Sequence, residues 1–250
     1  MMNPNNDSCR LLILGATSAI AEETARRFAA GKAGFCLVAR NPQKLKAVAD
    51  DLRVRGARQV EAISCDLSDL TQHTELITQA NRMLGGLDAV LIAYGTLPRQ
   101  EACERDRLAT LAAFETNCVS VISLLSLLAE YFEARRNGLI AVITSVAGDR
   151  GRRSNYIYGS AKAALNVFLE GLQMRLRGAN VSVLTIKPGP VRTPMTAHLQ
   201  PNVLFADPRS VGTVIYRAMK SKKRLIYVPW FWRYIMLIVR FVPSAMLKNV

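Results

Sequence analysis

The sequence predicts an α/β fold: a single doubly wound parallel sheet with helices on both faces, plus a C-terminal amphipathic extension. Short, almost wholly apolar segments, typical of strands buried on both faces, alternate with longer segments whose apolar residues recur at helical spacing. The chain has 250 residues, 50% of them hydrophobic and 21% charged, which suffices for one sizeable core. The sequence contains no internal repeat and no Pro/Gly/Ser-rich linker, so one domain is the economical interpretation.

The N-terminal half of the chain alternates strand and helix. Residues 10–14 consist of Arg10 and an uninterrupted apolar run, Leu11 to Leu14, that ends at Gly15, as a short buried strand would. Residues 19–30 place alanine, isoleucine and phenylalanine on one helical face. The alternation continues with apolar or alternating strands at residues 34–39, 59–65 and 89–93 and amphipathic helices at 42–55 and 70–84.

The C-terminal half begins with two longer units of the same kind. A helix at residues 114–135 leads into a strand at 139–144, and a helix at 158–177 leads into a strand at 181–186.

The last part of the chain departs from this alternation. A short strand at residues 225–228 precedes Pro229 and a very apolar helix that ends at Val242. We therefore expect residues 1–228 to form a nucleotide-binding catalytic domain. Residues 229–250 would be an apolar and basic extension, either part of that domain or a membrane-surface contact.

Charge and cysteine content narrow the class of protein. The net charge is +14, with 24 basic and 19 acidic residues up to Pro208 and nine basic and no acidic residues after it. Such an end suits nucleic acid, anionic lipid or a phosphorylated substrate, but no nucleic-acid-binding motif accompanies the charge. Five cysteines without a CxxC pair, and no secretory signal, indicate a cytoplasmic protein with reduced thiols. His73 and His198 are isolated, so no metal site is expected.

The segment from Gly15 to Ala21 (GATSAIA) lies between the first predicted strand and the first helix. A turn there points backbone N–H groups and a helix N-terminus at a pyrophosphate, and Thr17 or Ser18 could cap the helix. Alone this signal is weak, because only one of the usual three glycines is present.

Tyr158 and Lys162 are one helical turn apart, so they share a helix face and the ammonium should favour the phenolate. Ser145 ends a predicted strand thirteen residues before Tyr158, where open α/β sheets bind ligands. The competing Tyr156 has Ser160 four residues on and gains no cation. Together these residues predict acid–base chemistry at a tyrosine.

At these positions the chain resembles the short-chain dehydrogenase/reductase superfamily over essentially its whole length. Ala19 and Ala21 stand where the family has glycines, and Ala93 stands where it has an asparagine. The resemblance implies a Rossmann-type NAD(P)-binding fold. The catalytic places of the family fall on Ser145, Tyr158, Lys162 and Asn117. Its cofactor-binding places fall on Gly15, Thr17, Ser18, Ala19, Ile20, Arg40, Asp66, Leu67, Ala93, Tyr94, Gly95, Tyr158, Lys162, Pro188, Gly189, Val191 and Thr193.

The resemblance implies hydride transfer between a nicotinamide and a carbonyl or alcohol carbon. Tyr158 would exchange the hydroxyl proton, Lys162 would lower the pKa of that tyrosine and hold the nicotinamide ribose, and Ser145 would stabilise the oxyanion. Asn117 would hold a proton-relaying water, or would only satisfy backbone groups of its own helix. A catalytically silent nucleotide-sensing protein is the alternative from another class, and the intact Ser145, Tyr158 and Lys162 argue against it.

Cofactor choice depends on the end of the second strand, where Ala39-Arg40-Asn41 provides an arginine and no acid. An arginine accommodates a 2′-phosphate, so NADP(H) is favoured over NAD(H). Arg40 could instead stack on adenine or be plain surface charge.

Arg150, Arg152 and Arg153 lie between Ser145 and Tyr158 and predict contact with an anionic, phosphorylated substrate. A solvated turn or an ion-pairing subunit contact is the equal alternative.

The tail combines aromatic residues with Lys220, Lys222, Lys223, Arg224, Arg233, Arg240 and Lys248. That composition predicts peripheral contact with a membrane, the alternatives being closure of the substrate pocket or a dimer contact.

Within the superfamily the chain is most similar to the decaprenylphosphoryl-2-keto-ribose reductases. The resemblance rests on residues 15–21, 145–165, 192–199 and the ending up to Asn249. It implies reduction of a keto sugar carried on a polyprenyl phosphate, at the inner face of the cell membrane. A soluble ketoreductase for acyl or small alcohol and ketone substrates is the alternative. A homodimer or homotetramer is expected from the family.

Overall fold

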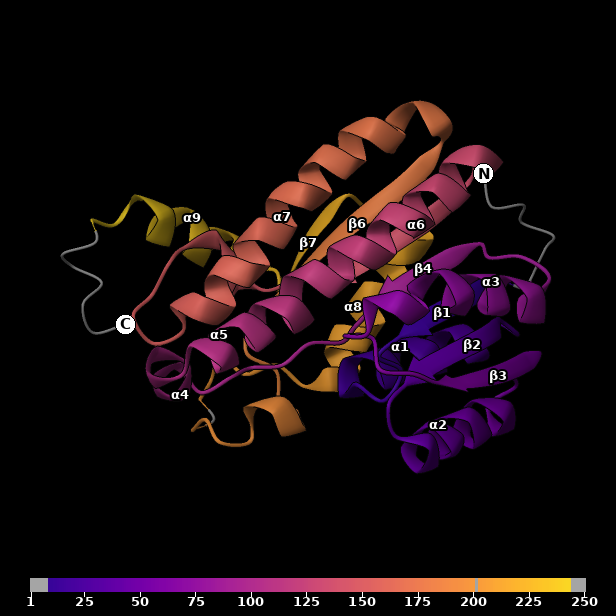
Figure 1. The fold of residues 1–250 in the computed structure, drawn as a ribbon, viewed down its shortest axis with the longest axis horizontal. Coiled ribbons are helices and arrows are strands. Elements are labelled where there is room, and N and C mark those ends of the chain that lie inside the picture. Colours follow the sequence, from indigo (N-terminus) through magenta and orange to yellow (C-terminus); the bar gives the residue numbers. More distant parts are fainter. Residues whose placement is uncertain (1–8, 201, 244–250) are drawn as a thin grey trace.

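The computed structural model describes residues 9–200 and 202–243. Its described part contains a seven-stranded parallel sheet in the order β3-β2-β1-β4-β5-β6-β7 (Figure 1). The α/β fold predicted from the sequence is confirmed. The strands are β1 (Arg10–Leu14), β2 (Gly34–Ala39), β3 (Gln59–Ser64), β4 (Ala89–Ile92), β5 (Gly138–Ile143), β6 (Val181–Pro188) and β7 (Leu225–Val228).

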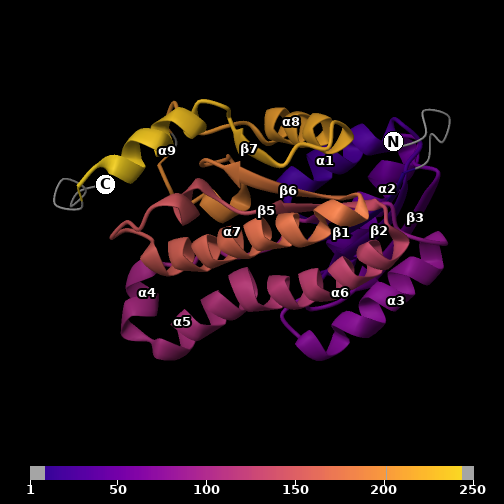
Figure 2. The same cartoon turned by 90° about the horizontal axis from the view of Figure 1, so that it is seen from above.

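Helices cover both faces of the sheet, with α1, α2 and α8 on one side and α3, α6 and α7 on the other (Figure 2). The α-helices are α1 (Ala19–Ala29), α2 (Pro42–Val54), α3 (His73–Leu84), α4 (Gln100–Arg105), α5 (Arg107–Phe114), α6 (Ser120–Arg135), α7 (Tyr156–Leu176), α8 (Pro208–Lys220) and α9 (Trp232–Phe241). Shorter helical turns are η1 (Leu70–Gln72), η2 (Glu115–Val119), η3 (Val146–Asp149), η4 (Arg177–Ala179) and η5 (Pro194–Thr196).

The apolar strands supply two cores because successive side chains of a strand point to opposite faces. Leu11 and Ile13 of β1 pack toward α1, α2 and α8, whereas Leu12 and Leu14 pack toward α3, α6 and α7. All four side chains are fully buried. This arrangement explains why central strands such as β2 and β4 are continuously apolar, whereas β3 at the sheet edge alternates.

The strand order reverses at β1, whose neighbours are β2 on one side and β4 on the other. In open α/β sheets the loops diverge at this point and leave a crevice outside the carboxyl ends of the strands. The turn after β1 and the loop after β4 therefore face each other there, and both carry predicted cofactor-binding residues.

Three helices were not predicted from the sequence: α4, α5 and α8. Asp106 caps α5 by accepting a hydrogen bond from the Leu108 backbone, and Asp207 caps α8 by accepting one from Arg209. Pro208 occupies the first turn of α8, a common signal of a helix start. These capping residues are sequence signals for the starts of α5 and α8, and a search for apolar spacing alone does not detect them.

The helical segment from Arg107 to Arg135 is long and apolar enough, by length and composition, to cross a membrane. It comprises α5, the π-helical turn η2 and α6. Leu124, Leu128 and Phe132 of α6 are fully buried in the core beneath the sheet. The apolar character of α6 is therefore accounted for by packing within the domain.

The C-terminal extension is continuous with the domain, because β7 pairs with β6 and α9 follows directly. Trp232 and Met236 of α9 are buried with Val146 of η3. The parallel sheet also separates the basic residues of the tail. Lys220 to Arg224 precede β7 and lie at its amino end, whereas α9 follows its carboxyl end. Lys220 to Arg224 therefore lie apart from the apolar helix, which itself carries Arg233 and Arg240, and the predicted membrane contact of the tail stays a prediction. Lys248 lies outside the described residues.

Candidate active site

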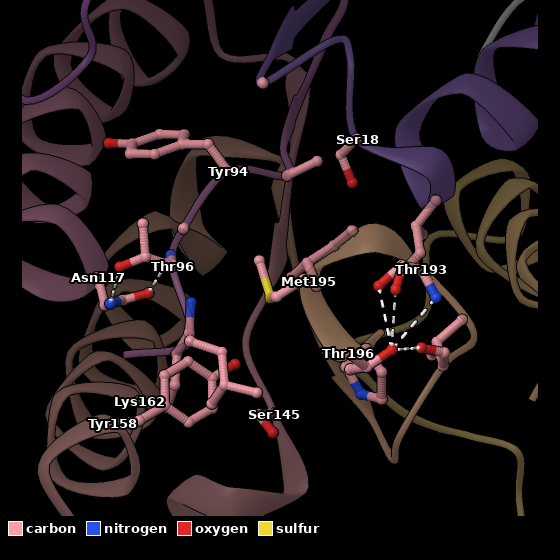
Figure 3. A pocket seen from close by; sticks show the side chains of 18 of the residues that line it. Ser18, Tyr94, Thr96, Asn117, Ser145, Tyr158, Lys162, Thr193, Met195 and Thr196 are labelled. Carbon is pink, nitrogen blue, oxygen red and sulfur yellow. Dashed lines mark hydrogen bonds between the residues drawn. The ribbon is translucent and has the colours of Figure 1, made fainter. Parts of the chain in front are cut away.

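A cavity of about 730 Å³ lies at the carboxyl edge of the sheet. Its size is within the usual range for a small-molecule or cofactor site. Figure 3 shows Asn117, Tyr158 and Lys162 together on one side of this cavity and Thr193 and Thr196 on the other.

Every cofactor-binding position predicted from the sequence contributes to the wall of this cavity. They are Gly15, Thr17, Ser18, Ala19, Ile20, Arg40, Asp66, Leu67, Ala93, Tyr94, Gly95, Tyr158, Lys162, Pro188, Gly189, Val191 and Thr193.

The turn after β1 requires a glycine at its first position. Gly15 has a φ of +87°, and a Cβ there would lie 2.7 Å from the backbone N and the Cβ of Tyr94. Ser18 occupies the N-cap position of α1, yet its side chain makes no capping hydrogen bond within the described part of the chain. The hydroxyl and the first N–H groups of α1 are thus available at the cavity, an arrangement that suits a phosphate.

Tyr158 and Lys162 lie next to each other at the start of α7, with the Lys162 Nζ 5.7 Å from the centre of the Tyr158 ring. Burial raises the pKa of the Tyr158 phenol to about 12, against a hydrogen bond from Ser145 that acts in the opposite direction. Burial also lowers the pKa of the Lys162 ammonium to about 8. The expected lowering of the tyrosine pKa is therefore wrong for this structure, because desolvation outweighs the other effects on the phenol.

Ser145 begins the turn η3 at the end of β5 in an extended conformation. Its hydroxyl accepts a hydrogen bond of 3.1 Å from the backbone of Ala147. This bond leaves the single hydroxyl proton for the neighbouring Tyr158 oxygen or for a substrate oxygen that takes its place in the cavity, which both residues line.

Asn117 is fully buried in the π-helical turn η2. Its amide nitrogen donates to the Ala113 carbonyl at 2.9 Å and to the Thr96 hydroxyl at 3.2 Å. Its amide oxygen accepts from the Thr96 backbone at 3.1 Å. Both amide hydrogens of Asn117 are therefore used in hydrogen bonds within the protein, as expected if this residue only satisfies neighbouring groups. The two bonds to Thr96 fix the loop after β4. Any proton relay would have to use the remaining lone pair of the oxygen.

The other side of the crevice is formed by the ends of β2 and β3. Arg40 is exposed at the end of β2, and its carbonyl accepts a hydrogen bond from the Ser64 hydroxyl. Asp66 follows β3 and accepts a hydrogen bond from the Ser68 backbone at 3.0 Å. Tyr94 follows Ala93, and its hydroxyl shares a hydrogen bond with the Ser120 hydroxyl. The Tyr94 side chain therefore points away from the ends of β2 and β3.

The structure separates the three arginines expected to contact substrate. Arg152 lines the cavity, whereas Arg150 and Arg153 do not. Arg150 instead donates to the Val242 carbonyl at 3.1 Å, and Arg153 is exposed. The expectation is wrong for these two residues because successive side chains of the loop point in different directions.

Arg152 is half-buried beside α9, and its Nη2 lies 3.6 Å from the Met236 sulfur. Within the described part of the chain its buried Nε has no hydrogen-bond partner. Desolvation lowers the pKa of this guanidinium. A desolvated guanidinium without an acidic partner is costly, and an anion in the cavity would offset that cost.

Trp232 lines the cavity from α9 and was not among the predicted site residues, although closure of the substrate pocket was one of the alternatives for the aromatic tail. A Cβ on Gly189 would overlap its indole ring, so Gly189 allows the close approach. The contact joins positions 43 residues apart and depends on how α9 folds back. Its only sequence signal is the aromatic content of the tail.

Asp149 fixes α9 to the catalytic loop. This carboxylate is buried and contacts Lys187 Nζ at 2.6 Å, the Tyr227 hydroxyl at 2.7 Å and Arg240 at 3.0 Å. These partners come from β6, β7 and α9, so one side chain after Ser145 connects three elements. Arg240 is therefore occupied within the protein rather than directed only at solvent.

Among residues 9–200 and 202–243, no group of histidine, cysteine and acidic side chains is arranged to hold a metal ion. His73 is buried, and its ring nitrogens contact the Ser123 hydroxyl and the Leu67 carbonyl.

The pattern of the family described as "short chain dehydrogenase" matches residues 10–203. The chain belongs to this family. An uncharacterized oxidoreductase of Mycobacterium tuberculosis is 37% identical over 96% of both chains, and one of Streptomyces coelicolor is 31% identical over 96% of this chain and 95% of the relative. A ketoacyl reductase of Nostoc is 26% identical over 87% of this chain and 77% of the relative.

Solved structures agree with the family assignment. A "short chain dehydrogenase/reductase family protein" has a TM-score of 0.77 at 25% identity, covering 88% of this chain and 94% of that structure. A 7α-hydroxysteroid dehydrogenase complexed with NADH has a TM-score of 0.81 at 21% identity, covering 91% and 96%, and shows the shared fold.

This short-chain dehydrogenase is therefore an NAD(P)-dependent oxidoreductase. The residues at this site fit a dinucleotide. The turn at Gly15 leaves space that a Cβ would fill, and the N-terminus of α1 lies beside it. The same cavity extends to Tyr158 and Lys162.

Proposed function

We propose that this enzyme reduces a ketone to an alcohol, and that the ketone belongs to a sugar carried on a polyprenyl phosphate. The observation that carries the substrate class is Arg152, a desolvated guanidinium without an acidic partner in the described chain, in the same cavity as Ser145 and Tyr158. The resemblance of the tail and of the arginine loop to polyprenyl-phosphate keto-sugar reductases supports the same substrate.

The catalytic chemistry is proposed for the side chains that meet around Tyr158. The dinucleotide supplies the hydride when bound, held by the turn at Gly15, by Lys162 and by the Pro188-Gly189 turn. The Tyr158 hydroxyl donates its proton to the carbonyl oxygen, since a phenol whose pKa is about 12 stays protonated throughout the neutral range.

Ser145 and Lys162 stabilise the charge that develops during this step. The Ser145 hydroxyl, already held by the Ala147 backbone, donates to the developing alkoxide. The Lys162 ammonium, with a pKa of about 8, is charged at neutral pH and lies beside the ring from which the proton departs. Its positive charge favours the resulting phenolate.

Arg152 would bind the phosphate of the substrate. A guanidinium matches phosphate oxygens with two parallel N–H donors, and the partly desolvated position strengthens each bond. Leu204, Met195 and Leu199 provide apolar walls in the same cavity for the adjoining lipid.

The preferred dinucleotide is proposed to be NADP(H). Arg40 is exposed at the end of β2 and lines the cavity, where it could pair with a 2′-phosphate. No acid occupies the equivalent position in the sequence Ala39-Arg40-Asn41.

The enzyme is proposed to act as a homodimer or homotetramer in the cytoplasm, at the inner face of the cell membrane. Val167 and Met174 form an exposed apolar strip on α7, one that pairing with a second copy would cover. Leu108 and Leu111 are likewise exposed on α5.

A substrate panel tests this proposal. NADPH and NADH oxidation would be measured with lipid-linked and free 2-keto sugar phosphates, uncharged keto sugars and acyl ketones. We expect turnover of the phosphorylated keto sugars, and an Arg152→Gln enzyme should raise KM for them by about tenfold while leaving the uncharged sugars unchanged. Equal effects on charged and uncharged sugars would contradict the phosphate contact.

The second candidate is a ketoreductase for acyl or small ketone substrates. The similarity to the ketoacyl reductase of Nostoc favours it. Turnover of acyl ketones with no turnover of any keto sugar in the same panel would select this candidate.

A further inference from the structure

Helix α9 has two apolar faces. Trp232 and Met236 are buried against the domain, whereas Tyr234, Leu237, Ile238 and Phe241 of α9 are exposed, as is Trp230 in the turn just before the helix. The four helical residues recur at helical spacing, and the Trp230 ring lies against that of Tyr234 with the ring centres 5.9 Å apart. The five side chains therefore form one stripe, which we call the outer face of α9. Trp230, Ile238 and Phe241 are 72%, 67% and 81% exposed. A soluble surface seldom presents so many large apolar side chains together.

The orientation of this stripe is fixed by polar contacts on the inner side. Arg240 contacts the buried Asp149, and Arg150 donates to the Val242 carbonyl at the end of α9. Arg152 contacts Met236 one turn earlier. The helix is thus held at three points and cannot rotate to bury its outer face in the domain. In Figures 1 and 2, α9 projects at the same end of the molecule as the start of α7.

The charged side chains that α9 itself carries are positive. Arg233 is exposed on α9, Arg153 is exposed on the loop that packs against it, and α9 contains no acidic residue. A second copy of the chain would bring the same cations against one another, which disfavours a self-association surface here. Anionic headgroups complement these cations, and Trp and Tyr side chains favour the headgroup level of a bilayer.

We propose that the outer face of α9 docks onto a bilayer containing anionic lipid, with the helix lying parallel to the membrane surface. This inference deepens the membrane contact of the proposed function by naming the surface that makes it. Because Trp232 of the same helix forms part of the cavity wall, docking places the cavity beside the lipid. The sugar end of a lipid-anchored substrate would then enter the cavity while its lipid chain stays in the membrane.

The test is co-sedimentation of the full-length protein with vesicles. The vesicles are made of equal parts phosphatidylcholine and phosphatidylglycerol, or of phosphatidylcholine alone. A Trp230→Ser/Ile238→Ser/Phe241→Ser enzyme should bind the anionic vesicles at least about tenfold less well than the wild type. The matched control, Val54→Ser/Leu70→Ser, removes exposed apolar residues of α2 and η1 and should bind normally. Arg233→Glu should weaken binding to anionic vesicles and leave binding to neutral ones unchanged.

Three outcomes would overturn the proposal. The first is a wild type that stays in the supernatant, and the second is a triple variant that sediments with vesicles like the wild type. The third is a triple variant whose mass by light scattering falls to that of a smaller oligomer, because the outer face would then be a contact between copies. Turnover of a water-soluble keto sugar should be the same in the triple variant and the wild type. Absence of keto-sugar turnover together with normal vesicle binding would contradict the proposed substrate and leave the docking surface standing.

Discussion

Lys162 is predicted to destabilise the folded protein at neutral pH. It is 3% exposed, and burial lowers the pKa of its ammonium from 10.5 to about 8. Between these two values the unfolded chain holds a proton that the folded chain has released, so the free energy of unfolding rises with pH across this window. Below pH 8 the full cost is present. At 1.36 kcal/mol per pKa unit it amounts to about 3 kcal/mol.

Replacing Lys162 with Met removes this cost while keeping a side chain of similar length. We expect Lys162→Met to be more stable than the wild type by up to about 3 kcal/mol at pH 7, and the difference to vanish as the pH approaches 10.5. The same variant should lose reductase activity. The assay is urea unfolding without dinucleotide at pH 7 and pH 10, followed by tryptophan fluorescence.

Lys187 provides the matched control, because it is also 3% exposed but contacts the Asp149 carboxylate at 2.6 Å. Lys187→Met leaves this buried carboxylate with Arg240 and Tyr227, and should destabilise the protein by about 3 kcal/mol at pH 7. The two variants are therefore expected to move stability in opposite directions. Equal destabilisation by both, or a Lys162→Met effect independent of pH, would refute the argument that Lys162 is a desolvated ammonium.

Three further predictions concern the cavity. Gly15→Ala should weaken NADPH binding and cost about 1 to 3 kcal/mol of stability, because the new Cβ meets Tyr94 at a positive φ; unchanged affinity by fluorescence titration would count against this turn as the phosphate cradle. Arg40→Asp should shift the ratio of kcat/KM values toward NADH by at least about tenfold, and an unchanged ratio would remove Arg40 from cofactor choice. The kcat/KM for ketone reduction should fall above about pH 8 as Lys162 loses its proton, and a flat profile to pH 10 would show that its charge is not needed.

Much of the fold and site could be predicted from short-range patterns. Buried parallel strands are continuous apolar runs, so the ranges of β1 and β2 agree with the sequence prediction. The turn at Gly15 and the one-turn spacing of Tyr158 and Lys162 are also local, and the structure places all three residues on one cavity.

What the sequence did not predict depends on contacts between distant segments. Trp232 lines the cavity from α9, a helix that is held to the domain by the Arg240–Asp149 ion pair and by packing against Val146. The direction of the Tyr158 pKa depends on its burial, which spacing along one helix does not reveal. Arg152 enters the cavity while Arg153 remains exposed, a difference of side-chain direction between neighbours in a loop.

The most direct test of the account is the Tyr158→Phe enzyme, which keeps the ring and removes the proton donor. Ketone-dependent NADPH oxidation would be measured beside the NADPH affinity of the same preparation. We expect turnover to fall by at least about 10³-fold while the dinucleotide Kd changes by less than about threefold. Turnover equal to that of the wild type would show that another group donates the proton, and would contradict the central claim.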